Sequence, residues 1–228
     1  MSRIQPIHLL LLVTFAMCSG CAVANRTDVE PNGSLVYLPQ DLEVELALAA
    51  GPEHMRSEAT VYVFGRSGYR QVRSGTNGIT CLVNRDGQQD GSRTLRPTCW
   101  DAEGSATIVP VVLRVGGLIA QGTSAEEIKQ DIDLGFQSER FISPRKTGIA
   151  YMLRGDVTFD ERSKTISETV FPPHYMIYAP GVSNADIGMT EEASRSNPSL
   201  PSVYDGYSGG SRTAYIIVVA SDGVEHAH

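Results

Sequence analysis

Hydrophobic and polar residues alternate in three short segments of the first half of the chain, separated by glycine-containing turns. The segments are residues 59–64, 69–73 and 79–85. A period of two places alternate side chains on opposite faces of a strand, so this pattern predicts a β-meander. In the third segment Ile79, Cys81 and Val83 share one face. We therefore expect Cys81 to point into a buried environment.

Helical patterns lie on both sides of this meander. Residues 41–50 begin with acidic side chains, continue with strong helix formers and are followed by Gly51-Pro52, which predicts a helix. Their even alternation also suits a strand, but the alanines favour the helix. Residues 105–137 predict a helical hairpin, broken near Gly116-Gly117 and Gly122. Its second helix begins at a capping box, a serine followed three residues later by a glutamate, formed by Ser124 and Glu127.

Three later segments have the composition of strands. They are residues 149–154, 174–179 and 214–220. The last segment is almost continuously apolar, which is typical of a strand buried on both faces. Between the last two lies a stretch rich in glycine and proline, residues 181–212, which we predict to be a long loop.

These patterns together predict an α+β fold, with a mostly antiparallel sheet and a helical hairpin insertion. The chain has 228 residues, enough for one domain with a substantial core. We expect that single domain to span residues 41–223. The polar, turn-rich residues 25–40 predict a linker before it.

The first 24 residues have the pattern of an export signal. Arg3 precedes a short apolar run, and small residues follow it. Two processing sites compete: Ala22-Val23-Ala24 fits release of a soluble protein beginning at Asn25, whereas the small residues before Cys21 resemble a bacterial lipobox, in which Cys21 would be acylated. The sequence therefore predicts a periplasmic or cell-envelope location, with membrane attachment only through a lipid on Cys21.

Export leaves two cysteines in the folded part, Cys81 and Cys99. Cysteines of an exported chain usually pair, and the turn-rich residues between these two let the chain double back, so we predict a Cys81–Cys99 disulfide. The alternative is a catalytic Cys81 thiolate with His174 as its base.

The densest set of polar residues follows Pro172-Pro173. His174 opens a predicted strand, and Asn184 and Asp186 come just after its end. If the three met in space, His174 could act as a base oriented by Asn184 or Asp186. The simpler interpretation is that His174 makes a structural hydrogen bond to a neighbouring loop.

Charge and motifs narrow the classes of function. The formal net charge is −7, and without a basic cluster nucleic-acid binding is disfavoured. Metal-ligand spacings such as Cys-x-x-Cys or His-x-x-x-His are missing, as are a P-loop, a dinucleotide fingerprint and a Gly-x-Ser-x-Gly elbow. We therefore predict no metal and no cofactor.

Several motifs resemble a family of exported bacterial proteins that has no assigned activity. They are ATVYV (59–63), GTNGITCLVNR (75–85), CWDAEGS (99–105), GIAYML (148–153) and PHYMIYAP (173–180). The resemblance covers most of residues 41–188. It implies that these segments belong to one domain, and it carries over no catalytic role.

The function that we predict from the sequence is that of an exported cell-envelope protein, a non-catalytic binding or structural module. Its partner would be a small molecule or another envelope component. The alternative is a Cys/His-dependent hydrolase of the periplasm or cell wall, so the sequence leaves open whether the protein is an enzyme.

Overall fold

The computed structural model describes residues 35–169, 171–206 and 209–220. The strands are β1 (Thr60–Gly65), β2 (Gly68–Arg73), β3 (Thr80–Asn84), β4 (Arg96–Trp100), β5 (Ile149–Met152), β6 (Val157–Asp160), β7 (Thr165–Glu168), β8 (His174–Tyr178), β9 (Ser202–Gly206) and β10 (Gly210–Val219). The helices are α1 (Gln40–Ala49), α2 (Glu53–Arg56), α3 (Ala102–Thr107), α4 (Val109–Ala120), α5 (Ala125–Gln137) and α6 (Glu191–Ser196), with short 3-10 turns η1 (Gln88–Asp90) and η2 (Ala185–Ile187).

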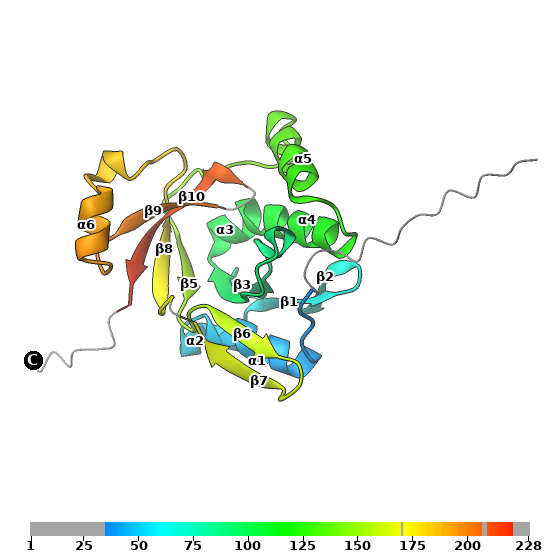
Figure 1. Cartoon of the computed structure of the whole chain (residues 1–228). Helices are drawn as coiled ribbons and strands as arrows, with labels where there is room; N and C mark the ends of the chain where they lie inside the picture. Colours follow the sequence, from blue (N-terminus) through cyan, green and yellow to red (C-terminus); the bar gives the residue numbers. More distant parts are fainter. Residues whose placement is uncertain (1–34, 170, 207–208, 221–228) are drawn as a thin grey trace, which may run out of the picture. The chain divides into compact units, whose positions relative to one another are not determined.

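An eight-stranded sheet organises the domain, in the order β2-β1-β3-β4-β5-β8-β10-β9. All neighbouring strands in it are antiparallel except β1 and β3, which are parallel. Strands β6 and β7 form a separate hairpin beside α1 (Figure 1). The predicted α+β class with a mostly antiparallel sheet is confirmed.

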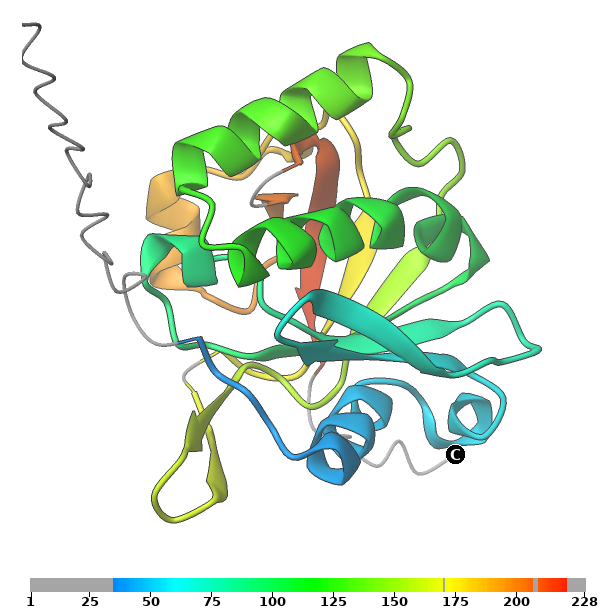
Figure 2. The same ribbon diagram turned by 90° about the vertical axis from the view of Figure 1, so that its right-hand side faces the viewer.

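Helices cover both faces of the β1-β3-β4 part of the sheet (Figure 2). On β3, Cys81 and Val83 pack in a cluster with α1, whereas Leu82 between them packs with Val109 and Val112 of α4. Because neighbouring side chains of a strand point to opposite faces, α1 and α4 lie on opposite sides of the sheet. Helix α5 packs on α4 rather than on the sheet.

The predicted meander is wrong in its third strand. Strands β1 and β2 form a hairpin, but β3 lies on the other side of β1 and runs parallel to it. The connection after β2 wraps round the start of β1: the Thr76 N–H donates to Glu58 O at 2.8 Å, and the Thr60 N–H donates to Ile79 O at 2.8 Å. Strand β2 thus provides the return that a parallel pair requires.

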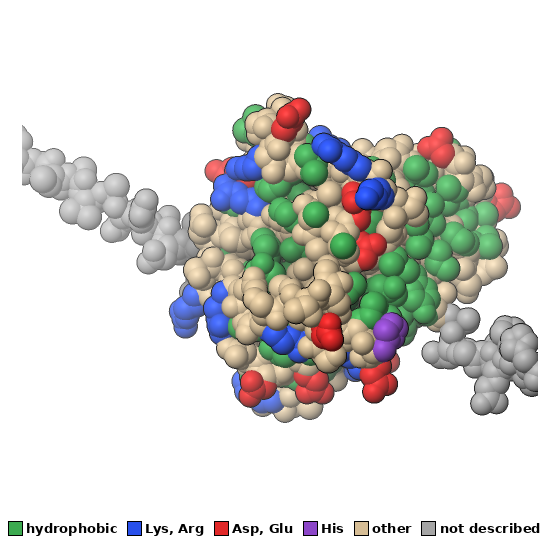
Figure 3. Space-filling view, turned by 180° about the vertical axis from the view of Figure 1, so that it is seen from behind, with side chains coloured by type: hydrophobic (Ala, Val, Ile, Leu, Met, Phe, Trp, Pro, Cys, Tyr) green, Lys and Arg blue, Asp and Glu red, His purple; other side chains and the backbone are tan. Residues whose placement is uncertain are grey.

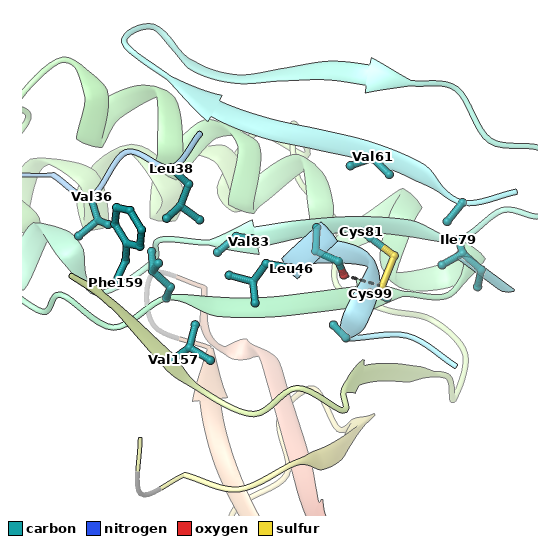
Figure 4. Close-up of a cluster of buried hydrophobic side chains, with 14 residues drawn as sticks. Val36, Leu38, Leu46, Val61, Ile79, Cys81, Val83, Cys99, Val157 and Phe159 are labelled. Atoms are coloured by element: carbon teal, nitrogen blue, oxygen red, sulfur yellow. Dashed lines mark hydrogen bonds between the residues drawn. A yellow bond between two sulfur atoms is a disulfide. The ribbon is translucent and has the colours of Figure 1, made fainter. Parts of the chain in front are cut away.

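The predicted disulfide is confirmed. Cys81 on β3 and Cys99 on β4 are direct cross-strand partners, with an S–S distance of 2.03 Å. Both lie in the apolar cluster between the sheet, α1 and β6, together with Ile79 and Val83 (Figure 4). The face predicted for Ile79, Cys81 and Val83 is therefore the observed one.

The folded domain begins earlier than residue 41. Val36 and Leu38, inside the range predicted as a linker, are 1% and 9% exposed and belong to the same cluster as the disulfide. Arg85 holds this segment through its Nε–H, which donates to Val36 O at 3.2 Å. The preceding residues, including the predicted signal and Cys21, lie outside the described part of the chain.

The helical predictions are largely confirmed, including the helix over 41–50 and the capping box. The Glu127 N–H donates to Ser124 Oγ at 3.3 Å, and the Ser124 N–H donates to Glu127 Oε2 at 3.2 Å. The break predicted at Gly116-Gly117 is wrong, because α4 continues through both glycines, whereas the break predicted near Gly122 is confirmed, since α4 ends at Ala120. The ring of Tyr69 fills the space beside Gly116, where an added Cβ would lie 2.3 Å from it. Gly116 therefore allows α4 to pack closely against the Tyr69 ring of β2.

The C-terminal half holds more regular structure than predicted. The stretch expected to be a loop over 181–212 contains α6, β9 and the first residues of β10, so this prediction is wrong. The β6–β7 hairpin was also missed. The missed strands β6, β7 and β9 are short, and cross-strand pairing that a sequence pattern does not reveal fixes them.

The β5-β8-β10 part of the sheet alternates cleanly between two faces. Along β8, His174 and Met176 are buried on the α4 side, whereas Tyr175 and Ile177 are half-buried on the other side. The half-buried apolar residues on this other side are Ile149, Tyr151, Tyr175, Ile177, Ile216 and Val218. Seen from behind, apolar side chains gather in a broad area at one side of the molecule (Figure 3). None of the described helices is long and apolar enough to cross a membrane.

Candidate functional site

A cavity of about 230 Å³ lies between the sheet and α4. Its floor comes from β4, β5, β8 and β10, where Trp100, Met152, Met176 and Ile217 contribute apolar side chains. Ile108, Val111 and Val112, at the start of α4, form the opposite wall. A concave apolar site with a few polar groups is the usual form of a small-molecule site.

Strand register explains why these residues converge. Trp100 pairs with Ala150, Ala150 with Met176, and Met176 with Ile217, so one row of side chains crosses four strands on the α4 side. Trp100 is 1% exposed, and its Nε1–H donates to Tyr215 Oη at 3.2 Å. This hydrogen bond satisfies the indole N–H within the protein and leaves the ring as apolar lining.

His174 lines the same cavity at the start of β8. It is 1% exposed, and its Nδ1 lies 2.8 Å from Pro172 O. A carbonyl oxygen only accepts, so Nδ1 carries the proton in this hydrogen bond. Burial lowers the pKa of His174, although the bond to Pro172 opposes that shift. Burial thus favours the neutral imidazole, in which Nε2 carries a lone pair.

Charged residues form one end of the cavity. Arg96 Nε lies 3.5 Å from Asp156 Oδ2, with side chains 16% and 13% exposed. The Arg96 Nη1–H also donates to Asp86 O at 2.7 Å. Burial raises the pKa of Asp156, and Arg96 opposes that rise. The bridge between Leu95 and Val157 sets Asp156 beside Arg96. Asn84, which pairs with Arg96, also lines the cavity beside this group, and further polar lining residues include Thr98 and His174.

Asn184 and Asp186 do not join His174, so the predicted triad is wrong. Asn184 Nδ2 donates to Val203 O at 3.0 Å, and Asn184 Oδ1 accepts from Val203 N at 2.7 Å, which pairs the loop with β9. Asp186 Oδ2 accepts hydrogen bonds from the N–H and the hydroxyl of Ser183. Neither residue lines the cavity. The chain turns at Gly181 after β8, so residues that are close to His174 in the sequence are directed to other partners.

Cys81 does not meet His174 either. Its sulfur is bonded to Cys99 in the cluster on the α1 side, whereas the cavity lies on the α4 side. A disulfide sulfur is not a thiolate, so the disulfide-bonded protein lacks the nucleophile that the hydrolase hypothesis requires.

Sequence reasoning missed most of the observed site. Trp100, Arg96 and Asp156 come from β4 and from the turn before β6, far from His174 in sequence. Trp100 is the one tryptophan of the chain. Its rarity was the one feature of the sequence that could have indicated this site. The location of Trp100 in a cavity depends on the four-strand register.

The described residues form an α+β domain with a pocket on a helix-covered face of its sheet. No family model matches the chain, and neither a curated protein nor a solved structure is similar enough to it to count as a match. Within the described residues, His, Cys, Asp and Glu side chains form no group of three or more that could hold a metal ion.

Proposed function

We propose that the protein is an exported, non-catalytic binding module of the cell envelope that holds a small molecule in the cavity beneath α4. One observation carries this proposal: the cavity combines apolar side chains such as Trp100 and Met176 with polar lining residues that include the buried His174. Such a combination orients a ligand through its polar group while apolar contact provides most of the affinity.

Binding is favoured over the hydrolase alternative by the placement of the candidate catalytic groups. Cys81 is bonded to Cys99, and Asn184 and Asp186 have their hydrogen bonds elsewhere. His174 keeps only its bond to Pro172 O among the described residues. An imidazole whose Nδ1 bonds a backbone carbonyl lacks the side-chain partner that orients a catalytic base, which favours recognition of a ligand over activation of water.

Two features support the proposed location in the cell envelope: the predicted export signal and the disulfide. Buried disulfides persist in oxidising compartments, and Cys81–Cys99 fits such a location. We expect the intact mass of the protein purified from its native host to correspond either to a chain beginning at Asn25 or to an acylated chain beginning at Cys21. A mass that includes Met1 would contradict both forms of processing.

Filling the cavity is expected to abolish binding. The replacement Val112→Phe adds a ring to the α4 wall of the cavity. The matched control, Ile177→Phe, adds a ring of similar size to the opposite face of the sheet. Small organic fragments would be screened by the emission of Trp100, the one tryptophan of the chain.

We expect fragments that alter Trp100 emission to bind Val112→Phe at least about tenfold more weakly, and Ile177→Phe as tightly as the unsubstituted protein. Circular dichroism would check that both variants are folded. Equal binding to all three proteins would place the ligand elsewhere and contradict the proposal, and so would a screen in which no fragment alters the emission.

A further inference from the structure

We propose that the pocket beneath α4 takes a small uncharged ring compound with a hydrogen-bond acceptor at one end and a hydrogen-bond donor at the other. The acceptor would meet the hydroxyl of Tyr215, and the donor would meet Nε2 of His174. This inference rests on the proposed function and specifies the chemical class of its ligand. It follows from the hydrogen-bonding capacity that these two buried side chains leave open among the described residues.

The Tyr215 hydroxyl has a proton to donate. Tyr215 lines the cavity and is 7% exposed. An indole N–H only donates, so the hydroxyl is the acceptor in the 3.2 Å bond between Trp100 Nε1 and Tyr215 Oη. No described residue accepts the hydroxyl proton. Burial raises the pKa of Tyr215, so this proton stays on the oxygen at neutral pH. Tyr215 therefore offers one neutral donor.

His174 offers the complementary group, a neutral acceptor. It lines the same cavity and is 1% exposed. Its Nδ1–H donates to Pro172 O, and burial favours the neutral ring, in which Nε2 can only accept. Nε2 lies nearer the tip of the ring than Nδ1, and no described residue donates to it. A buried acceptor without a partner costs free energy, so a donor on the ligand would stabilise the complex here.

The two groups lie at opposite ends of an apolar floor. Tyr215 pairs with the residue four positions along β8 from His174, which separates their backbones by about 13 Å along the strands at about 3.3 Å per residue. The cross-strand pair Met176 and Ile217 lies between them and lines the cavity. The Tyr215 hydroxyl reaches toward this row, because it contacts Trp100, which belongs to it. One ring on this floor can therefore carry a polar atom toward each end.

The volume of the cavity limits the body of the ligand. Its 230 Å³ is below the range of about 300–1,000 Å³ that is typical of pockets for drug-sized molecules. Trp100, Met176 and Val112 line it with apolar surface. This combination suits a single aliphatic ring rather than a long acyl chain.

The charged lining residues have partners within the protein. Arg96 Nε lies 3.5 Å from Asp156 Oδ2, and Asp86 Oδ1 accepts from Gln89 Nε2 at 3.0 Å. A charged ligand would lose its hydration on entering the cavity, and a neutral hydroxyl and a neutral imidazole would not compensate for that loss. A carboxylate has no proton for an imidazole nitrogen, and an ammonium group has no lone pair for a hydroxyl. An uncharged ligand with one group of each kind satisfies both residues.

Three compounds of nearly equal shape test the inference on the full chain. 4-Hydroxycyclohexanone carries a carbonyl acceptor and a hydroxyl donor at opposite ends of one ring. Cyclohexanone lacks the hydroxyl, and 4-methylenecyclohexanol has a methylene group in place of the carbonyl oxygen. Each would be titrated into the unsubstituted protein by calorimetry. We expect 4-hydroxycyclohexanone to bind at least about fivefold more tightly than either of the other two compounds.

Two substitutions assign each hydrogen bond to its residue. In Tyr215→Phe we expect the affinity for both ketones to fall at least about fivefold, and the affinity for 4-methylenecyclohexanol to stay the same. In His174→Leu the affinity for both hydroxyl compounds should fall by a similar factor, and that for cyclohexanone should stay the same. The matched controls, Tyr175→Phe and His54→Leu, remove the same groups from residues outside the cavity lining and should change no affinity. Circular dichroism would check the folding of all four variants.

The outcomes separate this inference from the proposed function. If either simpler compound binds the unsubstituted protein as tightly as 4-hydroxycyclohexanone, the inference is wrong, and this comparison decides even where a variant does not fold. Tighter binding of the charged analogues 4-hydroxycyclohexanecarboxylate or 4-aminocyclohexanol would also overturn it, as would equal losses for all three compounds in a variant. If none of the compounds binds, the inference fails, and the fragment screen with Val112→Phe decides separately whether the pocket binds any small molecule.

Discussion

Replacing Glu43 by glutamine is expected to lower the free energy of unfolding by about 3–5 kcal/mol at neutral pH. Glu43 and Arg85 are both fully buried, and Arg85 Nη1 lies 2.8 Å from Glu43 Oε1. The substitution leaves the guanidinium without a counter-charge in the interior, and arginine does not lose its proton there. Denaturant unfolding followed by circular dichroism would measure the loss.

Replacing the other member of the pair, Arg85→Met, should lower the free energy of unfolding by an amount that depends on pH. Burial raises the pKa of Glu43, and in the native protein Arg85 and the Phe64 N–H oppose that rise. Without Arg85 the pKa rises further, and the folded state keeps the proton that the unfolded chain releases above its ordinary pKa of 4.5. Stability is therefore retained at pH 4 and declines by up to about 1.4 kcal/mol per pH unit above it.

Two controls decide whether charge causes these losses. The double variant Glu43→Leu with Arg85→Met removes both charges, and we expect it to regain most of the stability. Glu191→Gln breaks an exposed pair with Arg195 and should change stability by less than about 0.5 kcal/mol. A double variant as unstable as the single variants would attribute the loss to packing and backbone contacts.

The surroundings of this pair support that expectation. Among the described residues, Glu43 Oε2, Arg85 Nη2 and Gln88 Nε2 are buried side-chain atoms without a hydrogen-bond partner. A half-satisfied polar cluster costs stability relative to an apolar core. The cluster connects separate segments of the chain. The Arg85 Nε–H donates to Val36 O, and Glu43 Oε1 accepts from the Phe64 N–H. The cluster thereby ties the segment before α1 to β1 and to the end of β3.

The sequence predicted elements whose periodicity is local. The alternation of Ile79, Cys81 and Val83 identified the correct face of β3, and the Ser124–Glu127 box located the start of α5. Each of these signals depends on neighbours a few residues away. The fold class followed because the predicted strands and helices were mostly present.

The candidate site was less predictable, because long-range pairing assembles it. His174 was identified, but its expected partners Asn184 and Asp186 bond elsewhere, and its neighbours in the cavity include Trp100, Met152 and Asp156. The parallel placement of β3 beside β1 has the same origin, since the meander pattern does not specify strand order. Register across a sheet is a property of the whole fold.

Removing the disulfide is expected to have the second largest effect. Cys81 and Cys99 are 18 residues apart, and closing a loop of this length stabilises the native state by about 3 kcal/mol in the chain-entropy model. Both sulfurs are also packed in the core against residues of α1. We therefore expect the double variant Cys81→Ala with Cys99→Ala to lose about 3 kcal/mol of unfolding free energy in denaturant titrations.

The same variant separates stability from binding. The disulfide lies on the α1 side of the sheet, whereas the neighbouring residues Thr98 and Trp100 point into the cavity on the α4 side. At temperatures where the variant is folded, Trp100 emission and its response to ligand should match those of the unsubstituted protein. Mass analysis of tryptic peptides would confirm the Cys81–Cys99 link beforehand. A stable variant with a lost ligand response would contradict both the stabilising role of the disulfide and its independence from the pocket.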